Sequence, residues 1–152
     1  MKKKISFIVA TFFGAGYFPK ASGTFGSLAT LPFVFFINQY FGLSGMLAFI
    51  TTTFVFGTIA TKEVLKHTTH DPKEIVIDET VGQSIALLYL AINPSVWTYV
   101  FGFALFRVFD ILKPYPVSYF DKQVENEYGV MLDDVVAGIF AFVVLYICGH
   151  LF

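Results

Sequence analysis

Five apolar runs, separated by short polar segments, constrain the fold of this 152-residue chain more than any other feature. Turn-forming residues join the first run to the second (42–45) and the third to the fourth (93–95). The pattern predicts an all-α fold with two helical hairpins and a C-terminal helix. The runs are residues 28–41, 46–61, 81–92, 96–106 and 135–152.

The composition favours a membrane-embedded chain. Hydrophobic residues make up 56% of the sequence and charged residues only 14%, against about 25% in ordinary soluble domains. By length, residues 1–152 form a single domain. A net charge of -1 gives no basic surface for nucleic acid, and the single Cys148 excludes an intrachain disulfide and a cysteine-based zinc site.

The charged residues predict the topology. All ten Lys and Arg residues, and the acids as well, lie at the N-terminus or between the hairpins, never at the hairpin tips. If each hairpin returns to its starting side, these segments share one face, which the positive-inside rule makes cytoplasmic. We therefore expect a polytopic helical bundle with about five short crossings, the N-terminus inside and the C-terminus outside. Residues 5–18 are expected to lie in the membrane interface.

The crossings are short. Most of the runs fall below the roughly 20 residues that a straight crossing needs. Either the helices extend into the polar segments, or the hairpins penetrate only partway.

Two acidic pairs, Asp78-Glu79 and Asp133-Asp134, each stand directly before an apolar run. Adjacent like charges beside apolar helices repel each other and are costly to desolvate. Magnesium would offset that cost, because it takes carboxylate and phosphate oxygens as ligands. The alternative is that acids at helix starts only complement the helix dipole.

A second set of charges lies near the end of the fourth run. Arg107, Asp110 and Lys113 are spaced so that they share one strip of a helix, which Pro114 ends. Arg107 and Lys113 could hold a phosphate, and Asp110 could be a metal ligand, a base or a nucleophile. The alternative is a ladder of salt bridges that anchors the helix end.

The Gly-rich residues 20–27 could form an anion cradle. The glycines permit close approach of the backbone, and Lys20, Thr24 and Ser27 supply donors. A simple turn before the first apolar run is the alternative. His67 and His70 lack a third nitrogen or sulfur ligand nearby, so we expect them to be solvated. Asp121 is either a supporting acid behind the site or an ordinary loop residue.

Four stretches together resemble the phosphatidylglycerophosphatase A family. They follow the family's order and span most of the chain, although Ser22 stands where a proline is usual. The stretches are residues 14–28, Asp71 with 75–79 and Gly82, 106–116 with Asp121, and 129–138.

The resemblance implies a Mg²⁺-dependent lipid phosphatase in the bacterial cytoplasmic (inner) membrane, multi-pass, with its active site facing the cytoplasm. Its substrate would be phosphatidylglycerophosphate, whose terminal phosphomonoester is hydrolysed to give phosphatidylglycerol and phosphate in phospholipid biosynthesis. Such a site can meet a headgroup while the acyl chains stay in the bilayer.

The hypothesis for the mechanism assigns each group a role. Four acids would hold one or two Mg²⁺, and Arg107, Lys113 and Lys20 would neutralise charge on the transferring phosphoryl group. Asp110 would be a base or a ligand, and an aspartyl-phosphate route through it stays open. The four metal-binding acids are Asp78, Glu79, Asp133 and Asp134, with Asp71 and Asp121 as supporting acids.

Two other classes of membrane protein fit the sequence less well than a lipid phosphatase. A CDP-alcohol phosphotransferase also uses Mg²⁺ and acids at the membrane surface, but its Asp-Gly and Ala-Arg signature has no counterpart here. An ion or proton transporter would carry acids in the middle of the membrane, whereas these acids stand at the starts of apolar runs.

Overall fold

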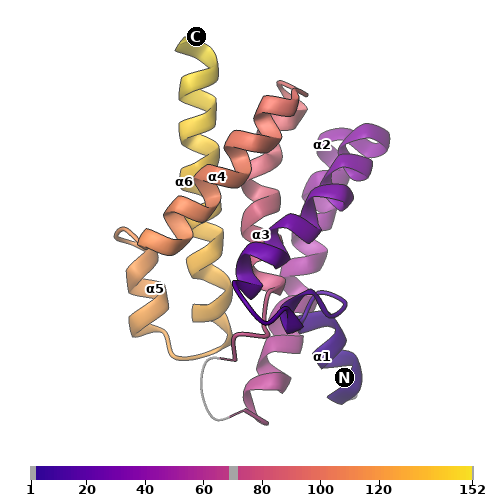
Figure 1. The fold of residues 1–152 in the computed structure, drawn as a ribbon, viewed down its shortest axis with the longest axis vertical. Coiled ribbons are helices and arrows are strands. Elements are labelled where there is room, and N and C mark those ends of the chain that lie inside the picture. The colour runs from indigo at the N-terminus through magenta and orange to yellow at the C-terminus, as the bar shows by residue number, and fades with distance from the viewer. Residues whose placement is uncertain (1–2, 69–71, 152) are drawn as a thin grey trace.

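The computed structural model describes residues 3–68 and 72–151, and all the regular secondary structure in this part of the chain is helical, as predicted (Figure 1). His70 and Asp71 lie outside the described residues. The helices are α1 (Lys3–Ala10), η1 (Ala15–Tyr17), α2 (Ser22–Leu65), α3 (Ile77–Ala86), η2 (Leu87–Ala91), α4 (Val96–Leu112), α5 (Val117–Gln123) and α6 (Glu127–Leu151).

Helix α2 reverses its direction at Gly42, whose backbone (φ 55°, ψ -148°) is not helical. A Cβ added at Gly26 would lie 2.7 Å from Val76, and one added at Gly57 would lie 3.0 Å from the neighbouring Ile77. A straight helix would separate Gly26 and Gly57 by about 46 Å. The two halves therefore run side by side, and Figure 1 shows α2 going up and coming back. This is the first predicted hairpin.

Helices α3 and α4 form the second hairpin. Gly82 faces Phe106, and Leu87, five residues further on, faces Gly102, so the two segments run antiparallel. Ser95 caps α4 by accepting a hydrogen bond from the Trp97 backbone N–H at 3.2 Å. The predicted run 81–92 is not one α-helix, because α3 ends at Ala86 and continues as η2.

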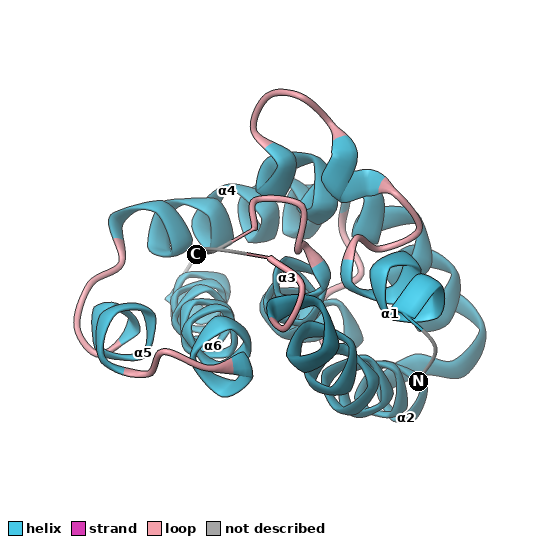
Figure 2. Ribbon diagram, turned by 90° about the horizontal axis from the view of Figure 1, so that it is seen from below, coloured by secondary structure: helices cyan, strands magenta, loops and turns pink. Residues whose placement is uncertain are grey.

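Helix α3 occupies the centre of the bundle, with α2, α4 and α6 around it (Figure 2). Its closest neighbour is α6, where Gly138 lies directly against the backbone of Gly82. Met131 of α6 and Val81 of α3 belong to one buried cluster with residues of α1 and α2. The start of α3 and the first turns of α6 are therefore held next to each other.

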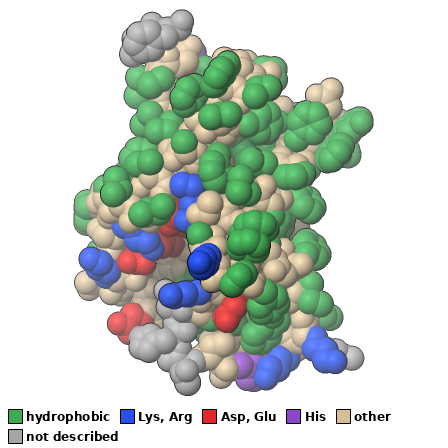
Figure 3. Space-filling model, in the orientation of Figure 1, with side chains coloured by type: hydrophobic (Ala, Val, Ile, Leu, Met, Phe, Trp, Pro, Cys, Tyr) green, Lys and Arg blue, Asp and Glu red, His purple; other side chains and the backbone are tan. Residues whose placement is uncertain are grey.

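Two of the described helices, α2 and α6, are long and apolar enough to cross a membrane. Hydrophobic side chains cover most of the face in Figure 3, and charged side chains gather in its lower part. This arrangement fits membrane association. The five-crossing topology stays a prediction.

Two helices begin earlier than the sequence indicated. Helix α6 starts at Glu127, capped by Asn126, which accepts from the Tyr128 N–H at 2.9 Å. Asp133 and Asp134 therefore lie about two turns inside α6 rather than at its start. Helix α2 starts at Ser22, so most of the Gly-rich segment is helical.

Candidate active site

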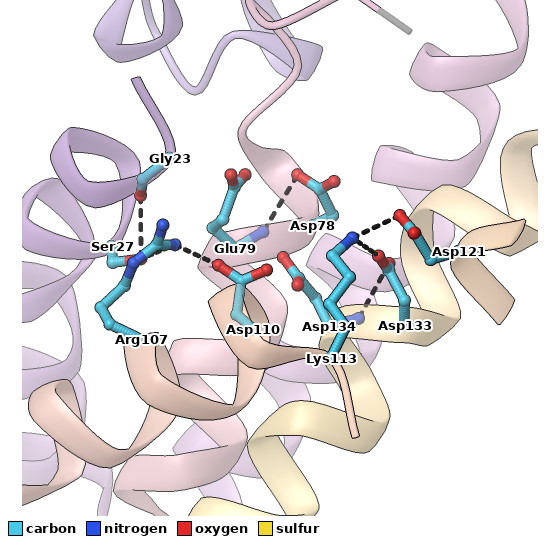
Figure 4. Close-up of polar contacts among 10 residues, drawn as sticks. All are labelled: Gly23, Ser27, Asp78, Glu79, Arg107, Asp110, Lys113, Asp121, Asp133 and Asp134. Carbon is cyan, nitrogen blue, oxygen red and sulfur yellow. Dashed lines mark hydrogen bonds and ion pairs between the residues drawn. The ribbon is translucent and has the colours of Figure 1, made fainter. Parts of the chain in front are cut away.

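A polar cavity of about 840 Å³ lies where the starts of α2, α3 and α6 meet the end of α4 and helix α5. Most of the charged residues singled out in the sequence meet here, although they come from four separate helices. Figure 4 shows them at close range. The cavity-lining members are Asp78, Glu79, Arg107, Asp110, Lys113, Asp121, Asp133 and Asp134.

Three carboxylates form a compact group in this cavity. Asp78 and Glu79 stand in the first turn of α3, and Asp134 reaches them from α6. One oxygen of each lies within 4.8 Å of the other two. The helix dipole accounts for acids in the first turn of α3, but it does not account for Asp134, which lies well inside α6. The helix dipole therefore does not explain the whole group.

The group is electrostatically costly without a cation. Burial raises the pKa of Glu79 to about 8, and burial followed by the charge of Glu79 raises the pKa of Asp78 well above its usual range. The buried Glu79 Oε2 has no hydrogen-bond partner among the described residues. Oxygens bound to Mg²⁺ lie at most about 4.2 Å apart, because each is about 2.1 Å from the ion. The group has the donor type and nearly the spacing for this cation.

Asp133 points in another direction. Its Oδ2 accepts a hydrogen bond from Lys113 Nζ at 2.8 Å, and Lys113 also pairs with Asp121. Lys113 is the C-cap of α4, with a left-handed backbone (φ 45°, ψ 57°) that turns it away from the strip of Arg107 and Asp110. It ties the end of α4 to α5 and α6.

These contacts keep Lys113 charged. Burial by itself would lower the pKa of Lys113, but hydrogen bonds to Asp121 and Asp133 outweigh burial and raise it above its ordinary value. The lysine is therefore a cation that two carboxylates already neutralise.

Arg107 and Asp110 form the other ion pair of the cavity, with Arg107 Nη1 and Asp110 Oδ2 2.5 Å apart. Arg107 Nη1 also donates to Ser27 Oγ at 3.4 Å. In Figure 4 the Asp110 carboxylate lies between Arg107 and the three grouped acids. The predicted salt-bridge ladder is thus half formed, since Lys113 takes other partners.

The predicted anion cradle is only partly at the cavity. Ser27 is buried, and its Oγ donates to the Gly23 carbonyl at 2.9 Å. Lys20 is exposed, and none of the three predicted donors lines the cavity, which this segment reaches through Ala21, Ser22 and Gly23. Headgroup binding by these residues stays a prediction.

Gly23 is a site residue that sequence reasoning did not single out. A Cβ added here would clash with Glu79 Oε1 and lie 3.3 Å from Arg107 Nη1. The repeated glycines of residues 20–27 were the available signal, although they do not say which glycine faces the acids.

Replacing Gly23 with Ala should lower turnover by about tenfold or more, because the methyl group displaces the Glu79 carboxylate. The fold should persist, since the clash involves the ends of two side chains. The measurement is the enzymatic rate, with thermal unfolding to confirm folding. Unchanged turnover in a folded variant would show that the position of Glu79 does not matter.

Fold and cavity together define the class of protein. In the described residues this is an apolar helical protein that gathers carboxylates, an arginine and three lysines in one polar cavity near the ends of its helices. The chain belongs to the phosphatidylglycerophosphatase A family, whose family model matches residues 8–148.

Two relatives that match over most of their length carry the name of this family, and a third carries the name of another lipid phosphatase. The chain is 40% identical to phosphatidylglycerophosphatase A of Haemophilus influenzae over 95% of this chain and 91% of that one. It is 36% identical to the Escherichia coli protein of the same name, over 94% and 83% of the two chains. A Bacteroides thetaiotaomicron protein, provisionally named a phosphatidylinositol-3-phosphatase, is 36% identical over 91% and 89%. No solved structure matches the chain.

Proposed function

We propose that this protein is a Mg²⁺-dependent phosphatidylglycerophosphatase, which hydrolyses the terminal phosphomonoester of its lipid substrate to phosphatidylglycerol and phosphate. The observation that carries the proposal is the group of Asp78, Glu79 and Asp134 beside the Arg107–Asp110 pair. Membership of the family and the names of two relatives supply the substrate.

Asp78, Glu79 and Asp134 would hold the cation, as their mutual spacing supports. When bound, Mg²⁺ supplies a Lewis acid for the phosphoryl oxygens. Asp133, which the sequence also assigned to the metal, has Lys113 as its partner in this structure. We therefore propose that Asp133 keeps Lys113 and the end of α4 in place.

Arg107 neutralises charge on the phosphoryl group in this proposal. Its guanidinium is held by Asp110 and Ser27, so little ordering is needed when substrate binds. The Arg107 Nε is buried and has no hydrogen-bond partner among the described residues. A donor of this kind is suited to an oxyanion or a bound water.

Asp110 accepts a proton from the attacking water. A bond forms between the water oxygen and phosphorus, and the bond from phosphorus to the glycerol oxygen breaks. The glycerol oxygen takes up a proton from solvent and leaves as a hydroxyl, and Asp110 then returns its own proton to solvent. The ion pair with Arg107 fixes the orientation of the Asp110 carboxylate. Trapping of a phosphorylated enzyme that disappears in Asp110→Asn would instead favour the aspartyl-phosphate route.

The protein would work in the bacterial cytoplasmic membrane as a multi-pass protein, with the cavity on the cytoplasmic side. The positions of the lysines and arginines support this orientation. The exposed Ile111, which also lines the cavity, offers an apolar contact for the lipid next to the charged groups.

Removing the metal should abolish activity. Purified protein in detergent is expected to release phosphate from short-chain phosphatidylglycerophosphate with Mg²⁺ and to lose at least about 99% of that rate with EDTA, because the metal supplies several kcal/mol of transition-state stabilisation. Excess Mg²⁺ should restore the rate. Full activity in EDTA would contradict the metal-dependent mechanism, and no release under any condition would contradict the function.

A further inference from the structure

Four basic residues line the cavity, and they divide into two kinds. Arg107 and Lys113 are partly buried and paired with carboxylates of the site. Lys73 and Lys122 are exposed, and neither forms an ion pair with any described residue. The cavity thus has two positive charges that its own acids do not engage.

These two lysines belong to different walls of the cavity mouth. Lys73 lies in the segment before α3, where Ser22 Oγ donates to its backbone carbonyl at 2.6 Å and so ties that segment to the start of α2. Lys122 lies in α5, directly after Asp121, which pairs with Lys113. Their exposure contrasts with Asp134, which is buried at 3% exposure. Asp78, Glu79 and Asp134 form the floor. The two lysines lie at the rim, where the exposed Asp121 is paired with Lys113 and the exposed Glu125 also lines the cavity.

The substrate proposed above carries two phosphates joined through one glycerol. The terminal phosphomonoester is the group that is cleaved, and the phosphodiester beside it keeps its negative charge throughout the reaction. When the phosphomonoester lies at the acid group on the floor, the phosphodiester extends toward the mouth. An ammonium group suits it, because lysine binds phosphate as a point charge without requiring a fixed geometry.

Resting on the proposed function, we infer that Lys73 and Lys122 bind the phosphodiester of the substrate and so select lipids with two phosphates over lipids with one. Phosphatidic acid has only the phosphomonoester, so it gains nothing from these lysines. The selectivity of the enzyme for its headgroup therefore lies at the rim rather than among the acids.

The test compares short-chain phosphatidylglycerophosphate with short-chain phosphatidic acid, using wild-type protein and the double variant Lys73→Gln, Lys122→Gln with Mg²⁺ in detergent. The double variant should raise the KM for the two-phosphate lipid by about tenfold and leave kcat within about twofold. For phosphatidic acid both constants should stay within about twofold. Arginine at both positions should restore the wild-type KM, because the charge returns.

Lys66→Gln is the matched control, since Lys66 is exposed near the same end of the molecule but pairs with Glu63 and does not line the cavity. It should change neither KM. Turnover of phosphatidic acid measures folding in each variant. The proposed phosphodiester site is overturned if the double variant loses activity on both lipids equally. It is also overturned if the ratio of kcat/KM between the two lipids stays at the wild-type value. In both cases the proposed function stands. A wild type inactive on both lipids would overturn both.

Discussion

Replacing Asp134 with Asn should lower phosphate release from phosphatidylglycerophosphate by about a thousandfold or more. The amide has nearly the same shape as the carboxylate, so the change removes one charge and one metal ligand with little change in volume. It also aims an N–H donor at Asp78 and Glu79, where a cation would lie. Loss of several kcal/mol of transition-state stabilisation corresponds to a rate effect of this size. Initial rates at saturating Mg²⁺ measure it.

The structure also predicts how stability responds to the same substitution. Without metal, three buried or half-buried carboxylates repel one another, so Asp134→Asn should leave the metal-free protein at least as stable as wild type. Mg²⁺ should raise the melting temperature of wild type and not that of the variant. Thermal unfolding of wild type and of Asp134→Asn in detergent, once with EDTA and once with Mg²⁺, measures both effects.

Glu74→Gln is the control for Asp134→Asn. Glu74 is an exposed acid close to the site in the chain, but it does not line the cavity. Its substitution should leave rate and metal response unchanged. A variant Asp134→Asn that keeps more than about a tenth of the wild-type rate would rule out Asp134 as a ligand that the reaction needs.

The sequence predicts the hairpins well because their signals are local. Apolar runs and turn residues locate the reversal at Gly42 and the turn before α4. The predicted helix starts are less accurate, because a pattern of apolar runs makes each helix begin after the last polar residue that precedes the run. Polar residues continue a helix readily when they face a cavity or solvent, as at Ser22 and Glu127.

The sequence predicts the arrangement of the site less well than that of the hairpins. Desolvation cost alone identifies the two acidic pairs as unusual, and the structure brings Asp78, Glu79 and Asp134 together. Asp78 and Glu79 are neighbours in α3 and both join the group, whereas Asp133 of the second pair turns to Lys113. Adjacency in the sequence therefore does not decide which acid faces the group. The partner of Asp133 depends on how α4 ends beside α6, which the sequence does not show.

The contact that assembles the site is invisible in the sequence, since it joins Gly82 of α3 to Gly138 of α6. A Cβ at Gly138 would lie 3.0 Å from the carbonyl carbon and from the Cα of Gly82, and closer still to its oxygen. These are backbone atoms, which no rotamer change can move. Any side chain at Gly138 must therefore push the two helices apart.

Gly138→Leu should accordingly destabilise the protein by about 3 kcal/mol or more, at the upper end of overpacking effects. Activity should fall as well, because Asp134 lies one turn from Gly138 and would move away from Asp78 and Glu79. Gly138→Ala should show the same losses to a smaller degree. Unfolding by denaturant in detergent and the rate of phosphate release measure both effects.

Ala104→Leu is the matched control, because Ala104 is exposed on α4 and a leucine there adds apolar volume without meeting another helix. It should change stability by less than about 0.5 kcal/mol and leave the rate intact. If Gly138→Leu is as stable and as active as Ala104→Leu, then α3 and α6 do not pack through these glycines. The carboxylate group would then have to be assembled by other contacts between α3 and α6, such as the buried cluster that contains Val81 and Met131.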